Sequence, residues 1–353
     1  MDFHKAICGI ALLVAASQAH AAGAAKQVSS PAASFNQNAA SSDIGQRIEN
    51  ASPGNGQNNT TSRPLLVKIQ VLLGRAHFSP GEIDGRYGKN LRAAVVAYKQ
   101  ANGLPNPDEI DTALADSLTR NGRAPVLQNY TITQEDETGP FIGSVPHDFR
   151  KLAALNAPAY GNPQEELAEK FHMSPELLRE LNPQADFSAA GTTLIVAQPA
   201  TSPLPSVARI EVDKSTNQVR AYGEDGNLAA MFPATVGSTE LPAPSGTAEV
   251  VYVSHNPAYH YDPSKLHFGP KHAGRLTIKP GPNNPVGTTW IALNRSGYGI
   301  HGSPDPDLVG KTASHGCVRL TNWDAEVLGR AVRKGIPVDF VGKTPPTRTA
   351  SRA

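Results

Sequence analysis

The sequence predicts a multidomain protein with a small three-helix module, an α+β module and a β-rich sandwich, in that order. Apolar residues recur at helical spacing within residues 64–122. Two strand-like stretches flank two short helical stretches within 130–197, and short runs rich in Val and Ile follow within 207–342. A chain of 353 residues is long enough for two or three domains of ordinary size.

Residues 1–21 have the features of a secretory signal peptide. A start that carries one lysine precedes an apolar run from Ile7 to Ala16, and Ala19-His20-Ala21 offers small residues at a cleavage point. The run is shorter than the roughly 20 residues that span a bilayer. Cleavage would remove Cys8 and leave Cys317 as the only cysteine, so we expect a free thiol. The sequence therefore predicts export across the inner membrane to the periplasm, without a stable membrane anchor.

Residues 22–63 are predicted to be a flexible, disordered tether. They are rich in Ala, Ser, Asn, Gln and Gly and hold few large apolar side chains, so they cannot bury enough surface to offset the entropy of ordering. The formal net charge of the whole chain is +1, and no basic run occurs in it. This composition argues against nucleic acid as a partner.

The helical module is predicted to span residues 64–122. Pro64 suits the first turn of a helix, a second helix ends before Gly103, and a third covers 111–118. Four short motifs mark the module: Ile69-Gln70, Asp84-Gly85-Arg86-Tyr87-Gly88, Ala94-Val95 and Gly103-Leu104. Their order resembles the peptidoglycan-binding module found beside many wall enzymes. A helical spacer with the same core is the alternative.

The α+β module is predicted to span residues 130–197. Tyr130–Ile132 and Gly191–Val196 are typical of strands, and Ser174-Pro175-Glu176 marks the start of one of the two helices between them. The order strand, helix, helix, strand resembles the LysM glycan-binding module. A long insertion, Gln134–Pro163, replaces the usual short link, so a rigid spacer of the same shape stays an open alternative.

A proline-rich linker, residues 198–206, precedes the predicted β-rich sandwich over 207–342. Short runs rich in Val, Ile and aromatic residues, separated by Gly, Pro and Asn, favour a sandwich or barrel. We expect one helix, Asp324–Lys334, and a flexible tail over 343–353. The expected strands are Ala208–Val212, Gln218–Tyr222, Ala229–Val236, Ala248–Val253, Thr289–Leu293 and Pro337–Val341.

Cys317 lies in the stretch that holds most of the reactive side chains, Ile300–Leu320. A thiolate is the nucleophile, so a catalytic cysteine needs a base or a positive field that lowers its pKa from about 8.5. His301 and His315 are the nearby candidates. The alternative is a small buried apolar residue, but the polar neighbours of Cys317 are unsuited to an apolar core.

The residues around Cys317 resemble the catalytic signature of the L,D-transpeptidases, the cysteine enzymes that cross-link bacterial peptidoglycan. The pair His301-Gly302 is followed by Ser314-His315-Gly316-Cys317-Val318-Arg319. Pro242–Gly246 and Asn284–Gly287 also match habitual segments of that family. The resemblance covers about Val207–Gly342 and implies a β-rich sandwich.

The resemblance also implies roles for individual residues. Cys317 is the nucleophile, His301 is the base, and the Gly302 carbonyl holds the ring in the tautomer that faces sulfur. Arg319 is expected to bind a substrate carboxylate, with a surface ion pair as the alternative. Substrate binding and support of the oxyanion are assigned to Ser314, His315, Gly316 and Arg319.

The implied reaction is acyl transfer on peptidoglycan stem peptides, as part of peptidoglycan biosynthesis and the maintenance of the cell wall and cell shape. The thiolate attacks the carbonyl of the third stem residue, the terminal D-alanine leaves, and an acceptor resolves the thioester. If a diaminopimelate amine accepts the acyl group, the product is a cross-link. If a lysine of a wall-anchored lipoprotein accepts it, the lipoprotein is anchored to the wall. If water accepts it, the enzyme is a carboxypeptidase. We expect no cofactor, because no metal or nucleotide motif occurs. A noncatalytic peptidoglycan-binding protein is the alternative from a different class.

Zinc is the main chemical alternative, because His301, His315 and Cys317 are acceptable ligands. The set is incomplete, since the short paired spacings of zinc motifs do not occur, and we expect no metal. The stretch 254–275 is predicted to be a long loop, either a lid or a surface insertion. It holds four more histidines: His255, His260, His267 and His272.

The modules before the linker are expected to hold the enzyme on an insoluble polymer and so to raise the local concentration of substrate. On this reasoning, a fragment that starts near Ser206 keeps its activity on small soluble muropeptides. It loses its retention on peptidoglycan sacculi.

Overall fold

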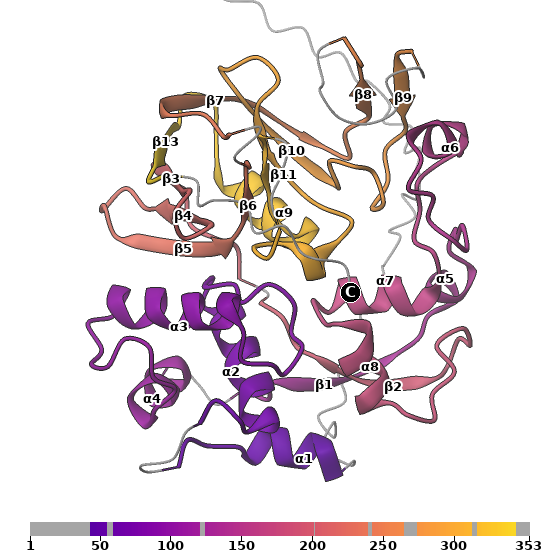
Figure 1. Ribbon diagram of the computed structural model, residues 1–353. Helices are drawn as coiled ribbons and strands as arrows, with labels where there is room; N and C mark the ends of the chain where they lie inside the picture. The colour runs from indigo at the N-terminus through magenta and orange to yellow at the C-terminus, as the bar shows by residue number, and fades with distance from the viewer. Residues whose placement is uncertain are drawn as a thin grey trace, which may run out of the picture. The chain divides into compact units, whose positions relative to one another are not determined.

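The computed structural model describes residues 43–54, 59–120, 124–200, 202–238, 242–264, 274–312 and 316–343 (Figure 1). All of these ranges belong to the same compact unit. The predicted signal peptide over 1–21 and, apart from Lys343, the predicted tail over 343–353 lie outside the described residues. Within the described ranges, no helix is long and apolar enough to cross a membrane.

Three helices form the predicted helical module: α2 Arg63–Arg75, α3 Lys89–Ala101 and α4 Thr112–Thr119. Pro64 lies in the first turn of α2, and the Asp111 side chain accepts a hydrogen bond from the Leu114 N–H and so caps α4. Their apolar faces share a core that includes Leu65, Ile69, Leu73, Leu91, Val95 and Leu114.

An additional helix, α1 Asp43–Asn50, lies within the range predicted to be a tether. Ile48 is 1% exposed and packs in the core with Val67 and Val71 of α2. The Lys68 Nζ donates hydrogen bonds to the main-chain oxygens of Glu49 and Ala51, at 2.6 and 2.9 Å. The tether prediction is therefore wrong for 43–50, because Ile48 and the half-buried Ile44 pack on apolar surface that α2 offers.

The α+β segment pairs β1 Leu127–Thr131 with β2 Thr193–Ala197 in an antiparallel register. Two helices lie between them in the chain, α7 Pro163–Lys170 and α8 Pro175–Leu181, and Asn162 and Ser174 cap them. The predicted order is observed, although β1 begins at Leu127. The insertion contains two further helices, α5 Gln134–Thr138 and α6 Phe149–Ala154.

In the part of the chain that the structure describes, nine strands form one mixed sheet with the order β5-β4-β3-β13-β7-β10-β11-β12-β6. β5 and β6 lie at opposite ends of this order, yet only Ala234 separates them in the sequence, so the sheet nearly closes on itself. The predicted sandwich is thus a single curved sheet. One helix, α9 Asn322–Ala331, packs against β10 and β11. The strands are β3 Arg209–Asp213, β4 Gln218–Tyr222, β5 Leu228–Pro233, β6 Thr235–Val236, β7 Gly246–His255, β10 Thr289–Leu293, β11 Gly299–His301, β12 Val318–Arg319 and β13 Pro337–Val341.

The predicted loop over 254–275 contains the first strand of a β-hairpin, whose second strand directly follows the loop. β8 Tyr259–Tyr261 pairs antiparallel with β9 Leu276–Ile278. Phe149 of α6 contacts the rings of Tyr259 and Tyr261, with centroids 5.8 and 5.3 Å apart. Residues 265–273, which include His267 and His272, lie outside the described residues.

The first turn of α9 is in contact with the segments that precede the linker. Three consecutive residues take part: Asn322 donates a hydrogen bond to Glu169, Trp323 stacks on His172, and Asp324 accepts one from Ser79. At the end of the linker, Leu204 is 7% exposed and belongs to the core of the sheet. These contacts argue against the expectation that a fragment from Ser206 acts alone.

We expect Asp324→Asn to make the protein's stability less dependent on pH. Asp324 is 4% exposed, and burial raises the pKa of its carboxyl to about 7, against opposing hydrogen bonds from Ser79 and Thr321. A raised pKa favours the protonated form in the folded state, so its contribution to stability is complete below the unfolded pKa of about 3.9 and is lost as the pH rises through about 7. Asparagine is neutral at every pH, so the melting temperature of the variant should fall less between pH 5 and pH 8 than that of the parent protein.

The measurement is thermal unfolding of parent and variant at both pH values. Some dependence should persist, because burial also raises the pKa values of Glu82 and Glu169 to about 7. Asp116→Asn, at an exposed position of α4, is the matched control and should leave the dependence unchanged. An equal loss of melting temperature in Asp324→Asn and parent would contradict this account.

Candidate active site

The two halves of the predicted motif lie on neighbouring strands. β11 and β12 run parallel, with Ile300 opposite Val318 and His301 opposite Arg319. Ile300 and Val318 are 0 and 1% exposed, so their burial in the core fixes this register. Cys317 immediately precedes β12 and therefore lies beside β11.

The Cys317 thiol is half-buried against the chain that leads into β11. Its Sγ lies 3.6 Å from the Gly297 carbonyl oxygen. Burial raises the pKa of the thiol, while a main-chain hydrogen bond at Gly299 and the charge of Arg319 act in the opposite direction. We expected the surroundings to lower the pKa of the thiol, but they raise it. Desolvation of the sulfur outweighs the positive field of Arg319. Gly316 has a φ of +111°, a backbone conformation that residues other than glycine rarely adopt.

The His301 imidazole is buried and held in one orientation. It stacks on the ring of Trp290, with centroids 5.4 Å apart, and its Nδ1 lies 2.7 Å from the Gly302 carbonyl oxygen. A carbonyl oxygen can only accept, so Nδ1 carries the proton and Nε2 of the neutral ring has a free lone pair. Burial, helped by the charge of Arg319, lowers the pKa of His301 to about 3. The ring is therefore neutral at pH 7 and able to accept a proton.

Asn322 lies against Gly302, and no motif in the sequence indicates this residue. A Cβ on Gly302 would collide with Asn322 Oδ1, so only glycine fits there. The same Oδ1 accepts a hydrogen bond of 3.1 Å from the Thr288 N–H. The Gly302 N–H donates to the Thr289 oxygen at 3.1 Å. The predicted helix started two residues too late, at Asp324, so Asn322 was placed outside it.

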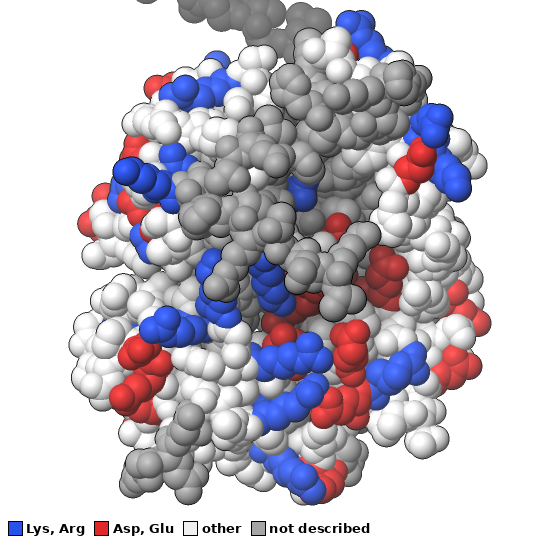
Figure 2. Space-filling model, viewed as in Figure 1, with Lys and Arg blue, Asp and Glu red and all other residues white. Residues whose placement is uncertain are grey.

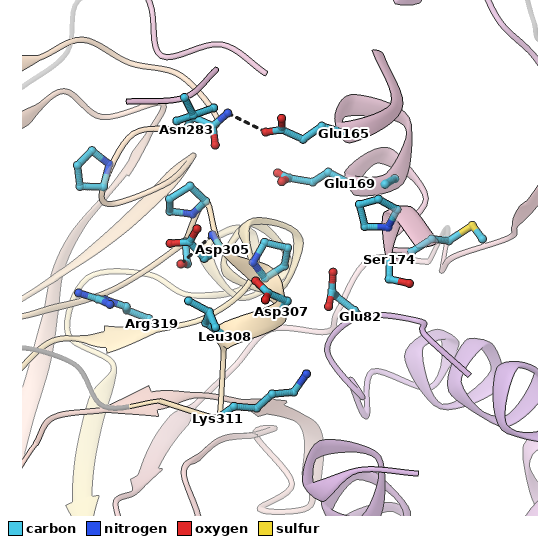
Figure 3. A pocket seen from close by; sticks show the side chains of 18 of the residues that line it. Glu82, Glu165, Glu169, Ser174, Asn283, Asp305, Asp307, Leu308, Lys311 and Arg319 are labelled. Carbon is cyan, nitrogen blue, oxygen red and sulfur yellow. Dashed lines mark hydrogen bonds between the residues drawn. The ribbon is translucent and has the colours of Figure 1, made fainter. Parts of the chain in front are cut away.

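Arg319 lies in the wall of a cleft of about 830 Å³ (Figure 3). Burial lowers the pKa of its guanidinium, and the neighbouring groups Cys317, Asp305 and Tyr259 oppose this shift. Asp305 and Lys311 of the catalytic domain also line the cleft, and the segments before the linker contribute Glu82 and residues of helix α7. Figure 2 shows Asp and Glu side chains gathered around a hollow in this face, with Lys and Arg beside them.

Tyr259 of the β8–β9 hairpin is a neighbour of Cys317 and Arg319 that the sequence did not indicate. Burial raises the pKa of its hydroxyl, and the charge of Cys317 adds to the effect while Arg319 opposes it. The hairpin therefore lies close to the candidate nucleophile. Because the stretch was predicted to be a loop, no strand pairing was available to place Tyr259 near Cys317.

Ser314 and His315 lie outside the described residues, so their roles in substrate binding and oxyanion support stay predictions. The structure does bring together His301, Gly302, Gly316, Cys317 and Arg319. In the described ranges, no group of three or more His, Cys, Asp or Glu side chains is placed to hold a metal ion. The zinc alternative includes His315 and is not tested by these residues.

We expect Arg319→Gln to raise the pKa of Cys317. The charge of Arg319 lowers the pKa of this thiol, so a neutral glutamine should shift the alkylation of the cysteine to higher pH. The measurement is the rate of alkylation by iodoacetamide as a function of pH. Arg319→Lys keeps the charge and is the control. An unchanged profile in Arg319→Gln would show that the guanidinium does not act on the sulfur.

Comparison with known proteins assigns two segments of the chain. The profile of the L,D-transpeptidase catalytic domain matches residues 207–339, and that of a putative peptidoglycan binding domain matches residues 62–110. The chain is 28% identical over 185 residues to the putative L,D-transpeptidase YkuD of Bacillus licheniformis, which covers 51% of this chain and 94% of that protein. It is also 28% identical over 185 residues to the probable L,D-transpeptidase YbiS of Escherichia coli strain K12, covering 51% of this chain and 60% of that protein.

Among solved structures, L,D-transpeptidase 3 from Mycobacterium tuberculosis is similar at 17% identity with a TM-score of 0.33, covering 43% of this chain and 76% of that chain. The predicted LysM-like module over 130–197 stays a prediction. The sequence profiles and the curated relatives nevertheless agree on one family. Residues 207–339 thus match the L,D-transpeptidase catalytic domain, and residues 62–110, which precede them, match a putative peptidoglycan-binding domain.

Proposed function

We propose that the protein is a cysteine-dependent L,D-transpeptidase that acts on peptidoglycan stem peptides, with Cys317 as nucleophile and His301 as base. The observation that carries the proposal is the contact between His301 Nδ1 and the Gly302 oxygen, on the strand beside Cys317. It leaves Nε2 as the proton acceptor in a neutral ring. A main-chain carbonyl thus takes the part that a carboxylate plays in other triads.

Acylation begins from a neutral thiol and a neutral imidazole. His301 Nε2 takes the thiol proton as Sγ bonds to the carbonyl carbon of the third stem residue. The tetrahedral oxyanion then collapses, the amide C–N bond breaks, and His301 returns the proton to the amine of the leaving D-alanine. A thioester on Cys317 remains. Because no thiolate need persist in the resting enzyme, the raised pKa of the thiol is compatible with this route.

Deacylation follows the same path in reverse with a different amine. The acceptor nitrogen attacks the thioester carbonyl, His301 takes one of its protons, and the sulfur leaves and is reprotonated. We propose that Ser314, His315 and Gly316, the three residues before Cys317, support the oxyanion. Arg319, in the wall of the cleft, is proposed to bind a carboxylate of the donor stem, which predicts a raised KM on its removal.

The acceptor could be a diaminopimelate amine, a lysine of a wall-anchored lipoprotein, or water. Each gives a different product, so incubation with a tetrapeptide muropeptide, with and without an amine acceptor, separates them by mass spectrometry of the products. A dimer indicates a cross-linking enzyme, an adduct indicates protein attachment, and a tripeptide indicates an L,D-carboxypeptidase. No release of D-alanine under any condition would overturn the proposed activity.

The match of residues 62–110 supports a second part of the proposal, retention on the wall. We propose that the protein is exported to the periplasm and held on peptidoglycan by this segment. Pelleting of the mature chain with isolated sacculi tests retention separately from turnover. Retention without turnover would favour the noncatalytic peptidoglycan-binding protein.

A further inference from the structure

A chain of contacts leads from helix α7 to the candidate base. Glu169 Oε1 accepts a hydrogen bond of 2.8 Å from Asn322 Nδ2. Asn322 Oδ1 lies against Gly302, where there is no room for a Cβ. The Gly302 oxygen, in turn, lies 2.7 Å from His301 Nδ1. Glu169 belongs to the segment before the linker, so this series of contacts begins outside the catalytic domain.

The orientation of the Asn322 amide decides whether this support works. Its Oδ1 accepts from the Thr288 N–H at 3.1 Å, and its Nδ2 donates to the Pro282 oxygen at 3.2 Å and to Glu169. A flipped amide would place Nδ2 against the Thr288 N–H, donor against donor. The contact with Glu169 is the shorter of the two bonds that Nδ2 makes, and it comes from a carboxyl group.

Glu169 is well suited to hold an amide in place. The same Oε1 accepts a further hydrogen bond, at 3.4 Å, from the Tyr160 hydroxyl. Figure 3 shows the side chain extending from its helix toward the catalytic domain. Burial raises the pKa of Glu169 to about 7, opposed by the hydrogen bonds from Asn322 and Tyr160 and helped by the charges of Glu165 and Glu326. A carboxyl group accepts through Oε1 in either protonation state.

We infer that Glu169 is a positioning residue for His301, acting through Asn322 and the Gly302 carbonyl; this inference rests on the proposed function. Without the carboxyl, the Asn322 amide can rotate away from Gly302. The carbonyl then no longer fixes the tautomer and direction of the imidazole, and the direction in which Nε2 can accept a proton is no longer held. The segment before the linker thereby contributes to the chemistry as well as to binding of the wall.

The first test compares Glu169→Ala with Glu169→Gln. Alanine removes the acceptor, and because a displacement of about 1 Å can cost about 100-fold in rate, we expect kcat to fall about 10- to 100-fold with KM nearly unchanged. Glutamine keeps an oxygen that can occupy the Oε1 position and accept both hydrogen bonds, so it should restore kcat. A Glu169→Gln variant as slow as Glu169→Ala would overturn the inference.

Glu165→Ala is the matched control. Glu165 lies on the same helix and also accepts a hydrogen bond of 2.8 Å from an asparagine of the catalytic domain, Asn283. The other hydrogen bond of the Asn283 side-chain amide runs to the Ala159 oxygen rather than to Gly302. Its loss should therefore lower kcat far less than the loss of Glu169 does, while costing a similar amount of thermal stability. An equal fall of kcat in both variants would show a merely structural contact.

A double-mutant cycle with Asn322→Ala tests the route. If Glu169 acts through Asn322, its removal should have no further effect on kcat in the Asn322→Ala background. Additive losses would overturn the inference.

Alkylation of Cys317 at pH 7 provides a readout that does not depend on the substrate. We expect it to be slower in Glu169→Ala than in Glu165→Ala, because the base is displaced. If the parent protein turns over no muropeptide, the proposed function fails, whereas equal alkylation rates in the two variants would overturn the positioning role.

Discussion

Replacing Cys317 by alanine should abolish turnover of a tetrapeptide muropeptide and leave the protein folded. The side chain is half-buried beside β11, and alanine fits the space it leaves. Without a sulfur there is no covalent intermediate, so the remaining groups can offer only binding and oxyanion support. We expect kcat to fall by at least about 10³-fold, as for other enzymes that lose a nucleophile.

The measurement is release of D-alanine over time, with thermal unfolding as the check on folding. Cys317→Ser is the matched variant, because it keeps the shape and a hydroxyl but has no thiol, and it should be nearly as inactive. Turnover at the parent rate in Cys317→Ala would end the assignment of this cysteine.

The second large effect is expected for His301→Ala. At pH 7 the neutral imidazole is the proton acceptor for the thiol, and general base catalysis contributes about 10²- to 10⁴-fold. We therefore expect a loss of that size in kcat. The loss should persist across the neutral pH range, because burial keeps the pKa of His301 at about 3 and the ring neutral.

His255→Ala is the control for the histidine substitution, since His255 is an exposed residue of β7. It should behave like the parent protein. Comparable turnover in His301→Ala and parent would contradict the assignment and move the role of base to His315.

Much of the fold follows from patterns that are local in the sequence. β4, β10 and β13 have the predicted bounds, because each holds apolar or aromatic residues, alternating with polar ones in β4 and β13, between turn signals. β11 and β12 were not predicted, since two or three residues carry no periodicity and the strands exist only through their mutual pairing. The site nevertheless depends on that pairing.

Long-range contacts account for what the sequence could not indicate. Glu169 is one polar residue on an ordinary amphipathic helix, and nothing near it in the sequence distinguishes it from Glu166. Its contact with Asn322 joins residues 153 positions apart. The rise in the pKa of Cys317 was missed for the same reason, because burial is a property of the folded protein while the neighbouring charges are visible in the motif.

The most direct test of the central claim is the mass of the protein after incubation with a tetrapeptide donor and no amine acceptor. If Cys317 carries the acyl group, the intact protein gains the mass of the donor minus D-alanine, the added mass maps to the peptide that contains Cys317, and addition of an amine acceptor removes it. The Cys317→Ser variant, which cannot form a thioester, serves as the reference. Turnover by the parent protein with the acyl group located on another residue would contradict the claim.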